Sequence, residues 1–208
     1  MKTLIVLGGA QPSQRLLASQ LDWAERVIAV DHGVDCMVDM GCEPDVLVGD
    51  LDSVKSPVHK LTCPIEQSDD KYSTDFEKGL RIAGKFERLH ILGGLGERTD
   101  HLLTNLLIAA GLDLSTNVLF MGDSEVIHRI SPARPLEGML MIGSTISLLP
   151  FSLCEGVESR GLRWNLSQTD MGIGLQLGQS NVVEKKDVQI KIRSGIMYAC
   201  IIPPSASV

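Results

Sequence analysis

The feature that most constrains this chain is a series of short apolar runs, each of which ends in glycine or an acidic residue. Within roughly the first 130 residues the runs are TLIVL (3–7), VIAV (27–30), VLV (46–48), LHIL (89–92) and VLFM (118–121). Continuous apolar runs are typical of strands buried on both faces of a parallel sheet. Pro12 and Ser13 open an amphipathic stretch, and residues 102–110 carry leucine and alanine at the helical period. The pattern therefore predicts strands that alternate with helices.

The pattern changes after Pro132 and Pro135, where helical periodicity ends. The β-like runs in this part are TISLLPF (145–151), GLQL (174–177), VQIKI (188–192) and IMYACII (196–202). Alternation of apolar and polar residues, as in VQIKI, is typical of half-buried strands. We therefore predict two domains: an N-terminal Rossmann-like parallel α/β sheet domain over 1–131, and a small C-terminal β-sandwich or barrel over 132–208.

Charge and composition exclude several classes of protein. The chain has 19 Lys+Arg and 26 Asp+Glu, a net charge of −7, whereas a general nucleic-acid binder needs a basic face. No apolar run approaches the roughly 18 residues that span a bilayer, and the first run is too short for the core of a signal peptide. The five cysteines include no CxxC pair, so we expect reduced thiols in a cytoplasmic protein and no zinc site.

The sequence GDLDS (49–53) directly follows the third predicted strand. In an open α/β sheet, ligands bind beyond the carboxyl ends of the strands. Asp50 and Asp52 are two residues apart and project the same way in extended backbone. Close carboxylates repel unless a proton or cation lies between them, and Mg²⁺ binds through one or two carboxylates plus phosphates. The sequence therefore predicts a magnesium site, although an isolated motif of this kind also occurs as a solvated turn.

The segment SDDKYSTDFEKGL (68–80) carries the start of a helix. Thr74 and Glu77 have the spacing of a capping box, which puts Asp75 at the first helical position. There Asp75 either complements the helix dipole or supplies a third carboxylate for metal or substrate. Lys71 either contacts a phosphate or is a solvated charge.

The segment GGLGERTDH (93–101) is a glycine-rich turn from a strand into a helix. Free backbone N–H groups at a helix start favour phosphate, and Arg98 adds a bidentate donor. Asp100 either holds a metal or orients Arg98. The turn lacks the third glycine of a dinucleotide fingerprint, and GxxxxGK[ST] is absent, so this is not a P-loop protein.

Taken together, these segments resemble the thiamine pyrophosphokinase family. The matching motifs are VDHGVD (30–35), GDLDS (49–53), DKYSTDFEKGL (70–80), GGLGERTDH (93–101), GLRWNL (161–166) and QSN (179–181). The resemblance implies transfer of a pyrophosphoryl group from ATP to the hydroxyethyl group of thiamine, giving thiamine diphosphate and AMP. It also implies Mg²⁺, a homodimer with sites shared between subunits, an α/β domain that binds ATP and Mg²⁺, and a β-domain that binds thiamine and dimerises.

The family's site residues carry over position by position. The resemblance implies catalytic roles for Asp50, Asp52, Asp75, Arg98 and Asp100, with Asp50, Asp52 and Asp75 as metal ligands. It implies nucleotide contacts by Asp31, Gly33, Lys71, Gly94, Gly96 and Arg98, and thiamine contacts by Trp164, Ser180 and Asn181. The chain departs from the family's DGGAN turn, because His32 stands for a glycine and Asp35 for the asparagine.

Three other functions remain open at this point. A pyrophosphokinase for another heterocyclic alcohol, such as a pterin, would keep the aspartates but need not keep Trp164. An oxidoreductase would use Asp31, about 20 residues after Gly8 and Gly9, but it would need the missing GxGxxG motif. A non-catalytic nucleotide or thiamine binder would not need several carboxylates beside an arginine.

Overall fold

The computed structural model describes residues 1–96 and 98–204, and the chain divides into two compact units. The first unit comprises residues 1–109 and 120–123, and the second comprises residues 110–119 and 124–208. Glu97 of the glycine-rich turn and the last four residues of the predicted second domain lie outside the described residues. We describe each unit separately.

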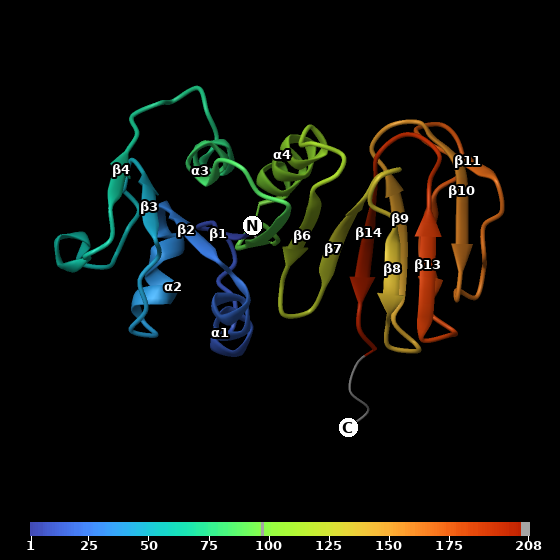
Figure 1. Ribbon diagram of the computed structural model, residues 1–208, viewed down its shortest axis with the longest axis horizontal. Helices are drawn as coiled ribbons and strands as arrows, with labels where there is room; N and C mark the ends of the chain where they lie inside the picture. The colour runs from blue at the N-terminus through green and yellow to red at the C-terminus, as the bar shows by residue number, and fades with distance from the viewer. Residues whose placement is uncertain (97, 205–208) are drawn as a thin grey trace. The chain divides into compact units, whose positions relative to one another are not determined.

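The first unit contains a parallel sheet with the strand order β5-β1-β2-β3-β4. Its strands are β1 (Lys2–Val6), β2 (Arg26–Val30), β3 (Val46–Gly49), β4 (Ile65–Gln67) and β5 (Arg88–Leu92). Its helices are α1 (Gln14–Trp23), α2 (Asp35–Val38), α3 (Asp75–Ala83) and α4 (Thr99–Ala110), with 3₁₀ turns η1 (Asp31–Val34) and η2 (Val58–Lys60). Helices α1 and α2 lie on one side of these strands, and α3 lies on the other (Figure 1). The predicted α/β character of this region is confirmed.

Burial on both faces explains the continuous apolar runs. In β1, Leu4 and Val6 belong to the same buried cluster as Leu17 of α1. Ile5 points the opposite way, where its side chain lies 3.3 Å from the position of a Cβ built on Gly79 of α3. Every residue of the strand interior is therefore buried, whichever face it points to.

The helix starts follow from local hydrogen bonds. Ser13 is the N-cap of α1, and its Oγ accepts from the Leu16 N–H at 3.2 Å. The capping box predicted at Thr74 and Glu77 is present at the start of α3. Helix α4 begins at Thr99, three residues before the predicted start, because its first turn is polar and carries no apolar period. No helix in the described part of the chain is long and apolar enough to cross a membrane.

The second unit is built from antiparallel strands. Its strands are β7 (Val126–Ile130), β8 (Leu136–Met139), β9 (Thr145–Pro150), β10 (Cys154–Arg160), β11 (Thr169–Met171), β12 (Gly178–Val182), β13 (Asp187–Lys191) and β14 (Met197–Ile202). The strand orders are β12-β9-β14-β7 and β11-β10-β13-β8. Strand β6 (Asn117–Met121) crosses the division between the units. The chain thus has a mixed α/β fold with a separate antiparallel sheet.

One predicted strand in the second unit is wrong. The chain turns at residues 173–175, Gln176 makes only an isolated bridge with Met171, and the strand β12 begins at Gly178. Gly174 has a φ of +79°, and Leu175 donates its N–H to the Gly172 carbonyl at 3.0 Å. Leu175 and Leu177 are exposed, so their apolar character does not reflect core packing. The unit's core comes instead from residues of both antiparallel sheets, such as Ile146 and Ile190.

Candidate functional site

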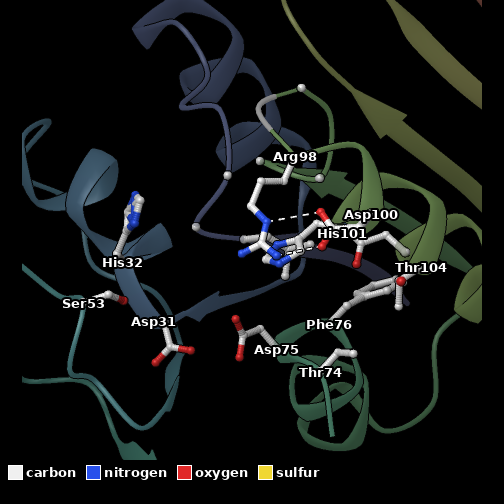
Figure 2. Close-up of a pocket in the computed structure, with 17 residues that line it drawn as sticks. Asp31, His32, Ser53, Thr74, Asp75, Phe76, Arg98, Asp100, His101 and Thr104 are labelled. Atoms are coloured by element: carbon white, nitrogen blue, oxygen red, sulfur yellow. Dashed lines mark hydrogen bonds and ion pairs between the residues drawn. The ribbon is translucent and has the colours of Figure 1, made fainter.

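A cavity of about 380 Å³ lies at the carboxyl ends of the parallel strands in the first unit. The loops after β1, β2, β3 and β5 and the first turns of α3 and α4 line it (Figure 2). Among its lining residues are Gly8, Gly9, Asp31, His32, Ser53, Asp75, Gly94, Gly96, Arg98, Asp100 and His101. Four of the five glycine-and-acid loops noted in the sequence therefore meet at one site.

The fifth loop, after β6, has a structural role. The Asp123 carboxylate accepts the Ser13 backbone N–H at 2.8 Å and also a short hydrogen bond from the Ser13 hydroxyl. Asp123 therefore fastens the start of α1 and is not among the residues that line the cavity. A glycine-and-acid loop at a strand end is thus not sufficient evidence of a site.

Asp31 and Gly49 are fitted to one another. Asp31 is buried, has a φ of +46°, and accepts the Leu51 N–H on its Oδ1 at 3.0 Å. Gly49 has a φ of +150°, and a Cβ built on it would lie 1.8 Å from the same Oδ1. The first residue of GDLDS is therefore glycine because the carboxylate of Asp31, directly after the neighbouring strand β2, occupies the space of its side chain.

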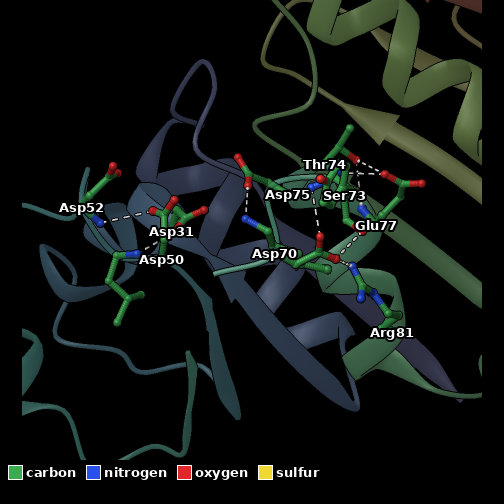
Figure 3. A network of polar contacts seen from close by, with 12 residues as sticks. Asp31, Asp50, Asp52, Asp70, Ser73, Thr74, Asp75, Glu77 and Arg81 are labelled. Carbon is green, nitrogen blue, oxygen red and sulfur yellow. Dashed lines mark hydrogen bonds and ion pairs between the residues drawn. The ribbon is translucent and has the colours of Figure 1, made fainter. Parts of the chain in front are cut away.

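Negative charge is concentrated around Asp31 (Figure 3). The pKa of Asp31 is raised to about 6, first by burial and then by the charges of Asp75 and Asp50, against the hydrogen bond from Leu51. Asp75 is also paired with Lys78, whose Nζ lies 3.2 Å from the Asp75 Oδ1 and is nearly buried. Burial opposes the charge on Lys78, but the pKa of Lys78 is raised overall because Asp75, Asp31 and Asp50 stabilise the ammonium. The structure thus brings together three carboxylates and one buried cation.

The predicted metal ligands are only partly assembled. Asp75 lines the cavity, whereas Asp50 and Asp52 have exposed side chains and are not among its lining residues. The Asp52 N–H donates to the Asp50 Oδ1 at 3.3 Å, which makes a local turn. Within the described residues, no three carboxylate, histidine or cysteine side chains are already arranged as metal ligands.

Arg98 and Asp100 form a bidentate pair at the edge of the cavity (Figure 2). The Arg98 Nε and Nη2 lie 3.1 Å and 2.6 Å from the two carboxylate oxygens of Asp100. The hydrogen bonds from Arg98 lower the pKa of Asp100 to about 2. Of the two roles considered for Asp100, this geometry favours the orientation of Arg98.

The loop before α3 is organised by Asp70. Its carboxylate accepts the Tyr72 N–H at 2.9 Å, the Ser73 hydroxyl at 2.7 Å and the Arg81 Nη2 at 3.0 Å. These hydrogen bonds, first the one from Ser73, hold the pKa of Asp70 well below its usual range. Lys71 is exposed beside this turn and is not a lining residue of the cavity.

Two departures from the family pattern have visible consequences. Asp35 accepts the backbone N–H groups of Ser56 at 2.8 Å and Lys55 at 3.2 Å, so it fastens the loop that follows GDLDS. Burial of Asp35 opposes ionisation, but the hydrogen bonds from Ser56 and Lys55 outweigh it and lower its pKa. The His32 ring lines the cavity, its Nδ1 lying 3.3 Å from the position of a Cβ built on Gly8.

Sequence reasoning missed several residues of this site. Lys78 had a usable signal, because it stands three residues after Asp75 and therefore on the same helix face. His101 and Thr104 extend the line of Arg98 along the first turns of α4 and into the cavity. Ser53 is the last residue of GDLDS, and it lines the cavity, whereas neither aspartate of the motif does.

The predicted thiamine-contacting residues lie together in the second unit. Trp164 is 58% exposed, and the Arg163 guanidinium carbon lies 5.6 Å from its ring centroid. The Trp164 N–H donates to the Asn181 Oδ1 at 3.2 Å, and the Asn181 Nδ2 donates to the Trp164 carbonyl at 2.7 Å. Ser180 is exposed next to Asn181 and has a φ of +58°. The two late motifs of the sequence are therefore one local structure.

Comparison with protein families gives two matches in sequence order. The model of the thiamin pyrophosphokinase catalytic domain matches residues 17–120, and the model of the thiamin pyrophosphokinase vitamin B1 binding domain matches residues 127–197. The first match contains all the strand-end loops that line the cavity except the loop after β1. The second contains Trp164, Ser180 and Asn181.

Individual relatives agree with these matches. Thiamine pyrophosphokinase 1 of Oryza sativa subsp. japonica is 29% identical over 182 residues, which cover 77% of this chain and 67% of the rice protein. Thiamine pyrophosphokinase 2 of Arabidopsis thaliana is 27% identical over 173 residues, which cover 75% of this chain and 64% of that protein. This chain therefore spans about two thirds of the length of these plant relatives.

Solved structures show the same fold. The thiamine pyrophosphokinase from Bacillus subtilis superposes with a TM-score of 0.81 at 21% identity, over 98% of this chain and 100% of that one. The succession of motifs, the two family matches and the shared fold lead to one conclusion. This chain belongs to the thiamin pyrophosphokinase family.

Proposed function

We propose that this protein transfers the pyrophosphoryl group of ATP to the hydroxyethyl group of thiamine, giving thiamine diphosphate and AMP. The observation that carries the proposal is the cavity in which Arg98 and two glycine-rich turns face a cluster of carboxylates. Such a site offers donors for phosphate oxygens and, opposite them, anionic oxygen ligands for a cation. Family membership supports thiamine over a pterin as the acceptor alcohol.

The nucleotide is bound in this proposal by the glycine-rich loops and their neighbours. The proposed residues are Asp31, Gly94, Gly96 and Arg98, which line the cavity, together with Gly33 and Lys71, which do not. Backbone N–H groups at the start of α4 suit phosphate oxygens, and the Arg98 guanidinium spans two of them. Asp100 holds the guanidinium in place before the nucleotide arrives, which supports a positioning role.

Mg²⁺ fits the donor chemistry of the site. Asp50, Asp52 and Asp75 would hold the ion, because carboxylate oxygens are the hard ligands that it prefers. The proximity of Asp75 and Asp50 to Asp31 supports this, since their charges add to the effect of burial in raising the pKa of Asp31 to about 6. When bound, the ion would offset that repulsion and the charge on the transferred phosphates.

The thiamine site in this proposal comprises Trp164, Ser180 and Asn181. Thiamine is a flat cation, and the face of a tryptophan ring attracts cations more strongly than other aromatic rings do. Support comes from the exposure of Trp164, since tryptophan side chains are mostly buried in folded proteins and this chain has only two of them.

We assign each substrate to one of the two predicted domains. We assign ATP and Mg²⁺ to a Rossmann-like domain over 1–131, and thiamine and dimerisation to a β-sandwich over 132–208. The parallel strand order of the first unit and the shared core of two antiparallel sheets in the second support these descriptions. A homodimer with shared sites and a cytoplasmic location stay predictions.

One assay tests the reaction. The protein is incubated with ATP, Mg²⁺ and thiamine, and the nucleotide product is identified by chromatography. We expect AMP and thiamine diphosphate in equal amounts. ADP as the product, or AMP only with another alcohol such as a pterin, would contradict the proposal, and absence of turnover would favour a non-catalytic binder.

Subunit mixing tests the shared site. Asp75→Asn and Trp164→Ala variants, each inactive alone, are mixed under conditions where exchange is monitored with differently tagged chains. Partial activity should return, because each heterodimer holds one site with both residues intact. Exchange without any return of activity would show that each site is complete within one chain.

A further inference from the structure

We propose that Asn181 is a positioning residue that holds Trp164 in place for the substrate cation. The inference rests on the proposed function and deepens its thiamine-binding side. It assigns to Asn181 an action through Trp164 in place of direct contact with thiamine. All the contacts that carry it lie within the second unit.

The amide of Asn181 is occupied by backbone groups. Its Oδ1 accepts the N–H of Trp164 at 3.2 Å and the N–H of Val182 at 2.8 Å, while its Nδ2 donates to the Trp164 carbonyl at 2.7 Å. The residue is only 7% exposed. A buried amide with both of its ends bonded has little capacity left for a ligand.

A β-bulge aims this side chain at Trp164. Strand β12 advances three residues, from Gly178 to Asn181, while its partner β9 advances two, from Leu148 to Ile146. Ser180 takes up the extra residue in a left-handed conformation, with a φ of +58°. A bulge of this kind redirects the next side chain, here Asn181, towards the chain segment that carries Trp164.

We call the two hydrogen bonds between Asn181 and the main chain of Trp164 the clamp. It acts on a residue that otherwise lies outside the core. Trp164 is 58% exposed, so packing alone does not fix its position. The neighbouring Arg163 is also fastened, through its N–H to the Val182 carbonyl at 2.8 Å and its Nε to Glu184 at 2.9 Å. The hydrogen bonds from Asn181 fix the main chain from which the Trp164 ring projects, and ordering this segment before the ligand arrives removes an entropic cost of binding. The clamp therefore prepares an exposed ring face for a flat cation.

The experiment uses the full chain in a Trp23→Phe background, where Trp164 is the single tryptophan and is excited selectively. We compare Asn181→Ala, which removes all three hydrogen bonds, with Asn181→Asp, which keeps the acceptor but loses the donor to the Trp164 carbonyl. Gln176→Ala, the loss of an exposed amide elsewhere in the same unit, is the matched control. Circular dichroism verifies folding, and the aspartate variant retains the test if the alanine variant fails to fold.

We measure the fluorescence anisotropy of Trp164 without ligands and the KM values for thiamine and ATP. Asn181→Ala should lower the anisotropy and raise the KM for thiamine about 10-fold, with the KM for ATP and kcat within about twofold of the parent. Asn181→Asp should lie between, and Gln176→Ala should match the parent. An increased thiamine KM with unchanged anisotropy would mean direct contact and overturn the inference. Lower anisotropy with an unchanged thiamine KM would overturn it as well.

Failure of the proposed function is recognisable separately. In that case the unsubstituted protein turns over no thiamine, whereas the anisotropy difference between the parent and Asn181→Ala persists. The clamp on Trp164 would then stand as a structural feature, and its role in thiamine binding would be refuted.

Discussion

The two units of this protein assemble their functional residues in different ways. In the first unit, parallel topology brings the ends of β1, β2, β3 and β5 to one edge, and residues far apart in sequence meet in one cavity. In the second unit, one bulge and one buried amide hold the main chain of a single exposed tryptophan. The first site therefore depends on charges contributed by many loops, and the second depends on a local hydrogen-bond geometry.

The largest effect that separates the two sites should come from Asp75→Asn. Loss of this carboxylate removes one member of the anionic cluster and the partner of Lys78, so we expect turnover to fall at least about 1000-fold. Steady-state kinetics at saturating Mg²⁺ measure it. Asp69→Asn, an exposed carboxylate of the same loop, is the control and should retain activity. Near-normal turnover of Asp75→Asn would remove Asp75 from the proposed metal site.

Gly49→Ala should disrupt the close approach between Gly49 of β3 and the Asp31 side chain. The new Cβ would displace the Asp31 carboxylate and its hydrogen bond from Leu51, so we expect a loss of about 2–3 kcal/mol of stability together with lower activity. Urea denaturation measures the stability. Gly41→Ala also sits at positive φ, +69°, but has nothing within 4 Å of its Cβ. It should cost about 1 kcal/mol and spare activity. Equal effects of the two changes would mean that only backbone strain matters.

Arg98→Lys should weaken the phosphate side of the first site while leaving the second unit unaffected. A guanidinium spans two oxygens and an ammonium does not, so kcat/KM for ATP should fall roughly 10- to 100-fold although the charge is kept. Trp164 fluorescence should not change. Arg88→Lys, an exposed arginine of β5, serves as the control. Unchanged kinetic constants would make Arg98 a surface charge.

A smaller, pH-dependent effect should belong to the second unit alone. Burial lowers the pKa of His128 to about 4, below its ordinary 6.5. As the pH falls below 6.5, His128 becomes protonated in the unfolded chain but stays neutral in the folded chain. The free energy of unfolding therefore decreases progressively down to about pH 4. Between pH 7 and pH 5 we expect it to account for about 1–2 kcal/mol.

The measurement is the difference in stability between pH 7 and pH 5, compared between the parent and His128→Asn. Asp31, whose raised pKa acts in the opposite direction over the same range, is present in both proteins and cancels from the comparison. His59→Asn, at an exposed position, should leave the pH dependence unchanged. An identical pH dependence in parent and His128→Asn would show that the His128 ring is solvated.

The sequence alone determined the classes of element and most of their places. Apolar runs located β1, β2, β3, β5 and β6 to within a residue or so, because buried strand faces carry mostly apolar side chains. Ser13 and the pair Thr74 and Glu77 marked helix starts, since capping is a local hydrogen-bond pattern. The family motifs likewise stood in the sequence itself.

Only the tertiary structure decided how these pieces meet. It separated Asp123, which fastens α1, from the strand-end acids that line the cavity, because that choice depends on which element each loop faces. It buried Lys78 near the carboxylates of Asp75, Asp31 and Asp50. It also showed why position 49 is glycine, because the Asp31 carboxylate occupies the space of a side chain there. It also turned GLQL from an expected strand into an exposed turn, and joined Asn181 to Trp164 across 17 residues of sequence. Local patterns report what a segment prefers, whereas the partners of a charge or an amide depend on contacts between distant segments.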